Sequence, residues 1–162
     1  MMTKQEKSLT MTVLMTPDMV NFSGKVHGGI VLKLLDQVAY ICAAKYAKSY
    51  VVTAALDNVF FKQSINVGEL VTFHANINYV GRSSMEVGII VVASDLLTNV
   101  KRHTNSCYFT MVAVDERGAS IEVPRLQLET DMDKKLFAAG ALRKQKRQET
   151  LEQNSDLQFD IE

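Results

Sequence analysis

The sequence has 162 residues, and 47% of them are hydrophobic, which suits one domain with a sizeable core. The 18 basic and 18 acidic residues cancel, so no net field favours nucleic acid or an anionic membrane as a partner. Cys42 and Cys107 are isolated in apolar runs, and no Cys/His spacing typical of a metal site is present. Residues 1–10 lack an apolar signal core and no apolar run approaches ~20 residues, so we expect a cytoplasmic protein.

The first half of the chain predicts a short strand followed by a long helix. Residues 9–16 alternate in polarity, and Pro17 ends that strand before a loop of turn-forming residues at 21–24. Residues 28–47 are apolar around most of a helical circumference, so we expect this helix to be buried. Its polar residues fall on one narrow stripe: Lys33, Asp36, Gln37 and Tyr40.

After this helix the pattern is that of strands, at 51–61, 70–80, 84–96 and 104–114, with turns at 67–69, 81–83 and 115–118. Residues 119–123 could extend the last strand. One strand, one buried helix and four or five long antiparallel strands predict an α+β fold. Because only the sheet could cover so apolar a helix, we expect a curved antiparallel sheet wrapped around a long central helix, which is the hotdog architecture.

The C-terminal part predicts a second, charged helix that begins at about Thr130, with acidic residues at its start and basic residues near its end. Gly140 weakens the middle of this helix. We expect four regions: an N-terminal extension at 1–8, the hotdog domain at 9–125, the C-terminal helix at 126–148 and a disordered tail at 149–162.

The first candidate site combines the backbone of Gly28 and Gly29 with the carboxylate of Asp36. Unpaired N–H groups at a helix start can polarise a carbonyl, and Asp36 could act as a base or nucleophile. Asp36 lies roughly 10 Å along the helix from Gly29, at 1.5 Å per residue, which is too far for both to act on one small group. If both act, two chains must meet. The alternative is a tight turn followed by a solvated stripe.

Two further features could carry chemistry. The turn Gly81–Ser84 offers backbone amides, the Arg82 guanidinium and two hydroxyls, which suits a phosphate, although an ordinary hairpin turn has the same composition. A basic set near the C-terminus could supply charge to a nucleotide or could be a solvated helix end: Arg143, Lys144, Lys146 and Arg147.

The pattern Asn21-x-x-Gly24-x-Val26-x-Gly28-Gly29-x-x-Leu32-x-x-x-Asp36 closely resembles the hotdog acyl-CoA thioesterases, the group of cytosolic acyl-CoA hydrolases and bacterial YciA-like proteins. Further blocks match in order at 52–61, 67–71, 80–87 and 108–115, so the resemblance covers about residues 10–125. Ser64 stands where the family usually has Pro, and Ser83 stands where Thr is common. The C-terminal helix and tail match weakly.

The resemblance implies hydrolysis of acyl-CoA to a free acid and coenzyme A, with Asn21 and Asp36 as the catalytic pair. Asp36 would activate water or attack the thioester, while Asn21 and the amides around Gly28 and Gly29 would orient and polarise it. Gly81, Arg82, Ser83 and Ser84 would contact the coenzyme A phosphates. Sites would lie between two chains, in dimers that assemble into hexamers as trimers of dimers. No metal or redox cofactor is implied.

Two alternatives stay open at this point. Another hotdog reaction on acyl thioesters, such as dehydration, usually needs a His, and His27 is the only local candidate. A non-catalytic regulator that binds coenzyme A or a nucleotide is the other alternative. The sequence does not fix the length of the acyl chain.

Overall fold

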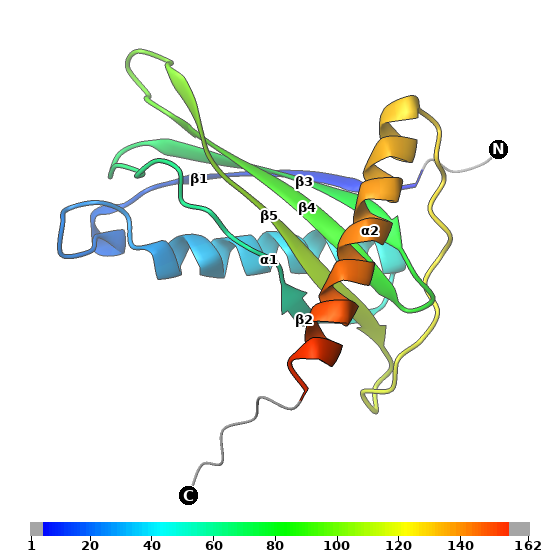
Figure 1. Cartoon of the computed structure of the whole chain (residues 1–162). Coiled ribbons are helices and arrows are strands. Elements are labelled where there is room, and N and C mark those ends of the chain that lie inside the picture. The colour runs from blue at the N-terminus through cyan, green and yellow to red at the C-terminus, as the bar shows by residue number, and fades with distance from the viewer. Residues whose placement is uncertain (1–4, 156–162) are drawn as a thin grey trace, which may run out of the picture.

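The computed structural model describes residues 5–155 as two helices and a five-stranded sheet (Figure 1). The elements in chain order are β1 (Ser8–Leu14), a 3₁₀ turn (Pro17–Met19), α1 (Gly28–Ala47), β2 (Tyr50–Leu56), β3 (Leu70–Val80), β4 (Ser84–Ser94), β5 (Lys101–Val114) and α2 (Asp131–Gln153). All strand pairs are antiparallel, in the order β1-β3-β4-β5-β2, so β1 and β2 are the edges.

The core lies between α1 and the sheet. Along β5, the side chains of Cys107, Phe109 and Met111 are buried in it, while the alternating Ser106 and Tyr108 point to the other face. A stripe of α1 covers the inner face: Val31, Leu35, Val38, Ala39, Cys42, Ala43 and Tyr46. A long helix across one face of an antiparallel sheet confirms the expected hotdog architecture and the expected helix at residues 28–47.

The sheet does not wrap α1 completely, as the apolar circumference had led us to expect. The polar stripe that includes Lys33 and Asp36 is exposed, and the apolar side chains of Ile30, Leu34 and Ile41 are only partly buried. Five strands cover one side of a helix, because a single sheet of this width cannot close around it. One flank of α1 is therefore open in the isolated chain.

The strand expected at 51–61 ends at Leu56, five residues early. The N–H of Asp57 donates to the carbonyl of Tyr108, and the N–H of Lys62 donates to that of Thr104, so the chain between them leaves the ladder and bridges over β5. Residues 119–123 make only an isolated bridge, from Ser120 to Val114, and do not form a strand.

Helix α2 is longer at its C-terminal end than the expected range of 126–148. Thr130 and Asp133 form a capping box at its start, which fixes the first helical residue at Asp131. Residues 149–153, which we expected in the tail, are helical. Residues 156–162 lie outside the described part of the chain, as do residues 1–4 of the expected extension.

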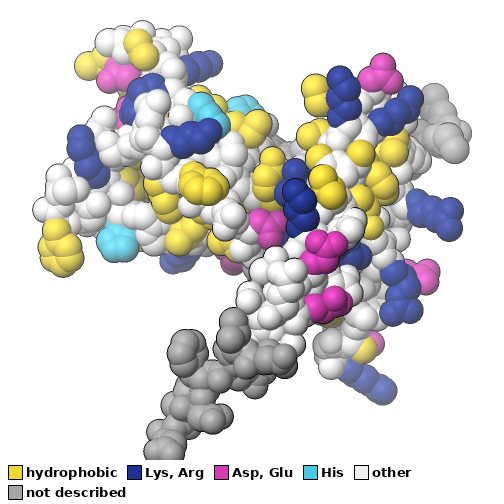
Figure 2. Space-filling model, viewed as in Figure 1, with side chains coloured by type: hydrophobic (Ala, Val, Ile, Leu, Met, Phe, Trp, Pro, Cys, Tyr) yellow, Lys and Arg dark blue, Asp and Glu magenta, His cyan; other side chains and the backbone are white. Residues whose placement is uncertain are grey.

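The surface carries no large patch of one charge in the view of Figure 2, where basic and acidic side chains are interspersed. Neither helix of the described chain is long and apolar enough to cross a membrane.

Gly140 allows α2 to approach the outer face of the sheet. A Cβ at this buried position would lie 2.5 Å from the Cβ of Tyr79 and 3.1 Å from Oε1 of Glu86. On either side of this contact, Phe137 lies against the ring of Tyr79, and Arg143 donates to the buried Glu86 at 2.6 and 2.9 Å. The glycine that weakens the helix by propensity is therefore what allows it to dock.

We expect Gly140→Ala to destabilise the protein, although Gly→Ala inside a helix ordinarily stabilises it by about 1 kcal/mol. Forcing a methyl group against backbone-anchored atoms costs about 1–3 kcal/mol, so the net loss in unfolding free energy should be about 1 kcal/mol. Urea unfolding measures the change. Lys135→Ala, at an exposed position of the same helix, is the matched control and should shift it by less than about 0.5 kcal/mol. A more stable Gly140→Ala protein would contradict this docking.

Both cysteine thiols should be unreactive in the folded protein. Cys42 and Cys107 are buried, and burial raises the pKa of each thiol to about 12, so the reactive thiolate is scarce near neutral pH. We expect a disulfide reagent such as DTNB to label neither thiol in the native state and both after unfolding in guanidinium chloride. Rapid labelling of the native protein would contradict the buried placement.

Candidate active site

The side chain of Asn21 organises the loop before α1. Its Oδ1 accepts hydrogen bonds from the N–H of Ser23 at 2.9 Å, the hydroxyl of Ser23 at 2.7 Å and the N–H of Lys25 at 3.1 Å. This closes a turn in which Gly24 has a φ of 76°. With Oδ1 fully used, the Nδ2 amide keeps its donors free of any partner within residues 5–155.

The two glycines at the start of α1 differ in what their N–H groups do. His27 is the N-cap residue, and its Nδ1 accepts from the N–H of Gly29 at 2.9 Å. The N–H of Gly28 has no acceptor in the described chain and stays available at the positive end of the helix dipole. Of the two, only Gly28 presents a free donor.

Asn21 and Gly28 border the same cavity, of about 290 Å³. Phe61 and Val31 form part of its apolar wall, and Ser64, which replaces the family's Pro, also lines it. Two uncommitted donors beside an apolar wall can hold a carbonyl oxygen and stabilise negative charge that develops on it. The structure thus brings together the expected Asn21 and Gly28.

Asp36 lies in the middle of α1, beside β2. Its Oδ1 accepts from the hydroxyl of Thr53 at 2.6 Å, while Oδ2 has no donor among the described residues. A second cavity, of about 310 Å³, is lined by Asp36, Tyr40, Val51 and Thr53, and it lies at the edge of the sheet because β2 is an edge strand. One carboxylate oxygen is held in place and the other is open to bind a water or a substrate.

Asn21 and Asp36 therefore border separate cavities in one chain. This agrees with their separation along α1, and no single-chain pocket of the described residues unites them. The half-site with Asn21 and Gly28 offers donors, and the half-site with Asp36 and Thr53 offers a carboxylate.

The turn Gly81–Ser84 lies apart from both half-sites, at the junction of β3 and β4. The N–H of Gly81 donates to the carbonyl of Ser84, and the carbonyls of Arg82 and Ser83 accept from Val123 and Ala113. Its backbone is thus largely engaged, whereas the Arg82 side chain is exposed and borders a cavity of about 500 Å³ that Arg125 and Glu122 also line. The two arginines could hold an anion there.

Sequence reasoning missed two side chains of these half-sites. His27 had been weighed as a base, and its ring instead caps α1. Thr53 looked like one more β-branched strand residue, and only the packing of β2 beside α1 brings its hydroxyl to Asp36. A hydroxyl on the helix-facing side of a predicted strand was the available signal. Elsewhere in residues 5–155, no group of three His, Cys, Asp or Glu side chains is arranged to hold a metal.

Comparison with known proteins places these residues among thioesterases. Residues 23–99 match the family model described as "Thioesterase superfamily". The chain is 44% identical over 145 residues to protein VdlD of Helicobacter pylori, covering 90% of this chain and 83% of that protein. It is 31% identical over 127 residues to an uncharacterised acyl-CoA thioester hydrolase, YkhA, of Bacillus subtilis, covering 78% and 74%. A human cytosolic acyl coenzyme A thioester hydrolase is 35% identical over 129 residues, which cover 78% of this chain but 34% of that protein.

Solved structures show the same fold over nearly the whole chain. A hexameric acyl-CoA thioesterase in its apo form is 37% identical, with a TM-score of 0.84 over 88% of this chain and 92% of that one. An acyl-CoA hydrolase of Staphylococcus aureus, in complex with butyryl coenzyme A and coenzyme A, is 28% identical, with a TM-score of 0.85 over 94% and 93%. That hydrolase has also been crystallised with alanine in place of an asparagine, an aspartate or a threonine.

Proposed function

The chain belongs to the acyl-CoA thioester hydrolases of the thioesterase superfamily, and on this premise we propose that it splits acyl-CoA into a free carboxylic acid and coenzyme A. One observation carries the proposal: Asp36, fixed by Thr53 through one oxygen, keeps its second oxygen open beside a cavity. No metal or redox cofactor takes part in the proposed reaction. The cytosolic relative supports a cytoplasmic location.

Spacing in a characterised neighbour supports the assignment of residues. The asparagine, aspartate and threonine replaced in the Staphylococcus aureus hydrolase are separated by 15 and 17 residues, as Asn21, Asp36 and Thr53 are here. Thr53 therefore joins the two residues that the sequence had indicated. Its hydroxyl donates to Oδ1 of Asp36 and so directs Oδ2 toward the reacting group.

In the proposed mechanism, the thioester carbonyl accepts hydrogen bonds from the N–H of Gly28 and from Nδ2 of Asn21. Both donors are free and share a cavity, so they can stabilise the oxyanion that forms when the carbonyl is attacked. Asp36 either takes a proton from the attacking water or attacks the carbonyl itself and is released by water. Either route ends with coenzyme A leaving as a thiol. Because the N–H of Gly29 donates to His27, we assign no substrate contact to Gly29.

A complete site needs two chains in this proposal. β2 is an edge strand with exposed apolar side chains, Tyr50 at 70% and Val52 at 45% exposure, and an edge of this kind favours pairing with another strand. Pairing at this edge would also cover the open flank of α1 and bring the Asp36 half-site to the half-site of Asn21 from a second copy. The hexameric neighbour supports assembly into a hexamer, which we propose to be a trimer of such dimers.

Substrate phosphates would be held at Gly81–Ser84, where the exposed Arg82 supplies the charge. Dehydration is a weaker second candidate, because the ring of His27, its only local base, caps α1. Turnover of an enoyl-CoA without thiol release would favour it, and binding of coenzyme A without any turnover would favour the non-catalytic regulator.

Asp36→Asn tests the proposed base. The amide keeps the shape of the side chain but has no basic oxygen to take a proton, so we expect kcat to fall by about 10²–10⁴-fold, with an unchanged circular dichroism spectrum. Release of free thiol from a series of short to long acyl-CoAs measures the rate and also reports chain-length preference. Lys33→Gln, on the same exposed stripe, should retain full activity. Normal turnover by Asp36→Asn would rule out the assignment.

Asn21→Asp separates the two jobs of Asn21. The carboxylate still accepts from Ser23 and Lys25, so the loop and the thermal stability should persist, but the Nδ2 donor is lost. We expect kcat to fall by about 10²–10³-fold, as for loss of one oxyanion donor. A drop in stability with undiminished kcat would assign Asn21 to the loop alone.

Mixing the two inactive proteins tests the two-chain site. After reversible dissociation, an equal mixture of Asn21→Asp and Asp36→Asn chains forms mixed dimers in which one of two sites is intact. Random pairing should therefore restore about a quarter of wild-type activity. If each site were built within one chain, every site would carry a lesion and the mixture would stay inactive.

A further inference from the structure

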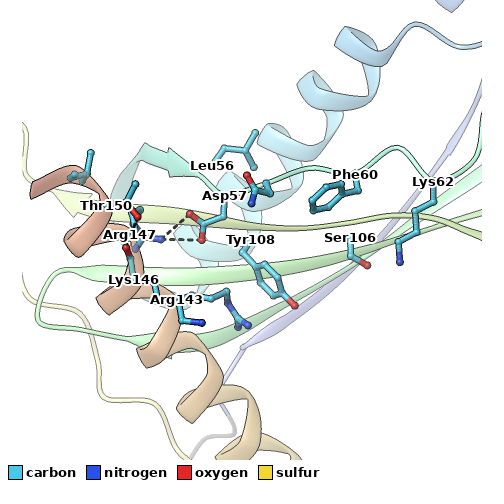
Figure 3. Close-up of a pocket in the computed structure, with 12 residues that line it drawn as sticks. Leu56, Asp57, Phe60, Lys62, Ser106, Tyr108, Arg143, Lys146, Arg147 and Thr150 are labelled. Atoms are coloured by element: carbon cyan, nitrogen blue, oxygen red, sulfur yellow. Dashed lines mark hydrogen bonds and ion pairs between the residues drawn. The ribbon is translucent and has the colours of Figure 1, made fainter. Parts of the chain in front are cut away.

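A cavity of about 620 Å³, larger than either half-site, lies on the outer face of the sheet. Figure 3 shows its walls: β5, one side of α2 and the segment 57–62 that follows β2. Ser106 and Tyr108 of β5 line it, and these alternate with the core residues that face α1. Neither Asn21 nor Asp36 borders it, and its volume falls within the ~300–1,000 Å³ typical of small-molecule sites.

Two arginines of α2 form a fixed part of the wall. Arg147 donates to both oxygens of Asp57 at 3.0 and 3.1 Å, and Arg143 is held by Glu86 and lies 3.7 Å above the ring of Tyr108. The hydrogen bond from Glu86 raises the pKa of Arg143, so its charge is permanent. These pairs fasten α2 to the segment 57–62 and to the sheet, so they give the cavity a rigid shape.

Two lysines of the cavity have no carboxylate partner within residues 5–155. Lys146 of α2 and Lys62 at the end of the segment 57–62 both border the cavity, as Figure 3 shows. Asp57, the single carboxylate of the lining, is already paired with Arg147. The lining therefore carries an excess of positive charge on a protein whose overall net charge is zero.

The rest of the lining suits a flat, partly apolar group. Phe60 borders the cavity with 64% of its surface exposed, which is unusual for so large an apolar side chain in the absence of a partner. Leu56 and Leu151 add apolar surface, and the hydroxyls of Ser106 and Thr150 add polar contacts. An open aromatic face for stacking, hydroxyls, and unpaired cations together match a base, a sugar and phosphates.

This cavity is joined to the Asn21 half-site by consecutive residues. Phe60 lines the outer cavity, and Phe61 lines the cavity that contains Asn21 and Gly28. The segment 57–62 thus forms a wall of both. A ligand that orders Phe60 would also constrain Phe61, which gives the outer cavity a physical route to the proposed reaction.

We propose that the outer cavity binds a nucleotide phosphate, with Phe60 stacked on the base and with Lys62 and Lys146 on the phosphates. Two sources share this chemistry. One is the nucleotide head group of acyl-CoA, which rests on the proposed function, and the other is a free nucleotide acting on the enzyme, which does not. In the first case the phosphates lie here and not at Gly81–Ser84.

Calorimetric titration of the full-length chain with ADP tests the site without requiring turnover. We expect the wild type to bind ADP and the double variant Lys62→Gln/Lys146→Gln to bind it at least about tenfold more weakly, since a hydrogen bond to a charged group contributes about 1.5–3 kcal/mol. Phe60→Ala should weaken binding by about tenfold through lost stacking. Lys135→Gln, an exposed lysine on the same helix that borders none of these cavities, should bind ADP as the wild type does.

These substitutions are at exposed side chains, and circular dichroism checks that each variant is folded. Displacement of ADP by coenzyme A, with a raised KM for acyl-CoA and an unchanged kcat in the lysine variant, identifies the substrate head group. Simultaneous binding of both, with an ADP-dependent change in kcat that the lysine variant lacks, identifies a free nucleotide. Absence of ADP binding to the wild type, or equal binding by the lysine variant, overturns the proposal and leaves the hydrolase assignment standing.

Discussion

The packing of α1 against the inner face of the sheet determines where the functional groups of this protein lie. Fully buried side chains such as Leu35 and Val38 each contribute about 1.5–3 kcal/mol through burial, so the rotation of α1 about its axis is fixed. That rotation sets the start of the helix, with Gly28, at one cavity and holds Asp36 beside β2. The same packing leaves the opposite flank of α1 uncovered, which makes a second copy the natural complement.

Charge on the outer face has a different role from charge near α1. The buried Glu86 has its charge balanced by Arg143, and Asp57 is paired with Arg147, so two ion pairs anchor α2 where apolar burial is modest. Breaking one partner of such a pair would leave a buried charge uncompensated. The segment 57–62 is held between this anchored helix and the Asn21 cavity. Both proposed sites therefore depend on a segment with no regular secondary structure of its own.

Local patterns predicted several elements well. The helix at 28–47 and the strand at 70–80 have the bounds that their periodicity indicated, because apolar spacing and flanking glycines act over a few residues. The apolar run at 51–61 was misjudged in its second half. Its β-branched and aromatic composition is that of a strand, but Asp57 and Lys62 bond to carbonyls of β5 across the sheet, and such distant partners cannot be read from a local pattern.

The sequence by itself determined the order of the elements, the exposed stripe with Asp36 and the motif residues Asn21, Gly28 and Gly29, since each depends on neighbours within a few positions. Only the tertiary structure decided that His27 occupies the N–H of Gly29, that Thr53 reaches Asp36, and that α2 encloses an outer cavity with unpaired lysines. The physical reason is that hydrogen bonds and cavities depend on the distance between elements far apart in the chain. That distance is set by packing, which is a property of the whole fold.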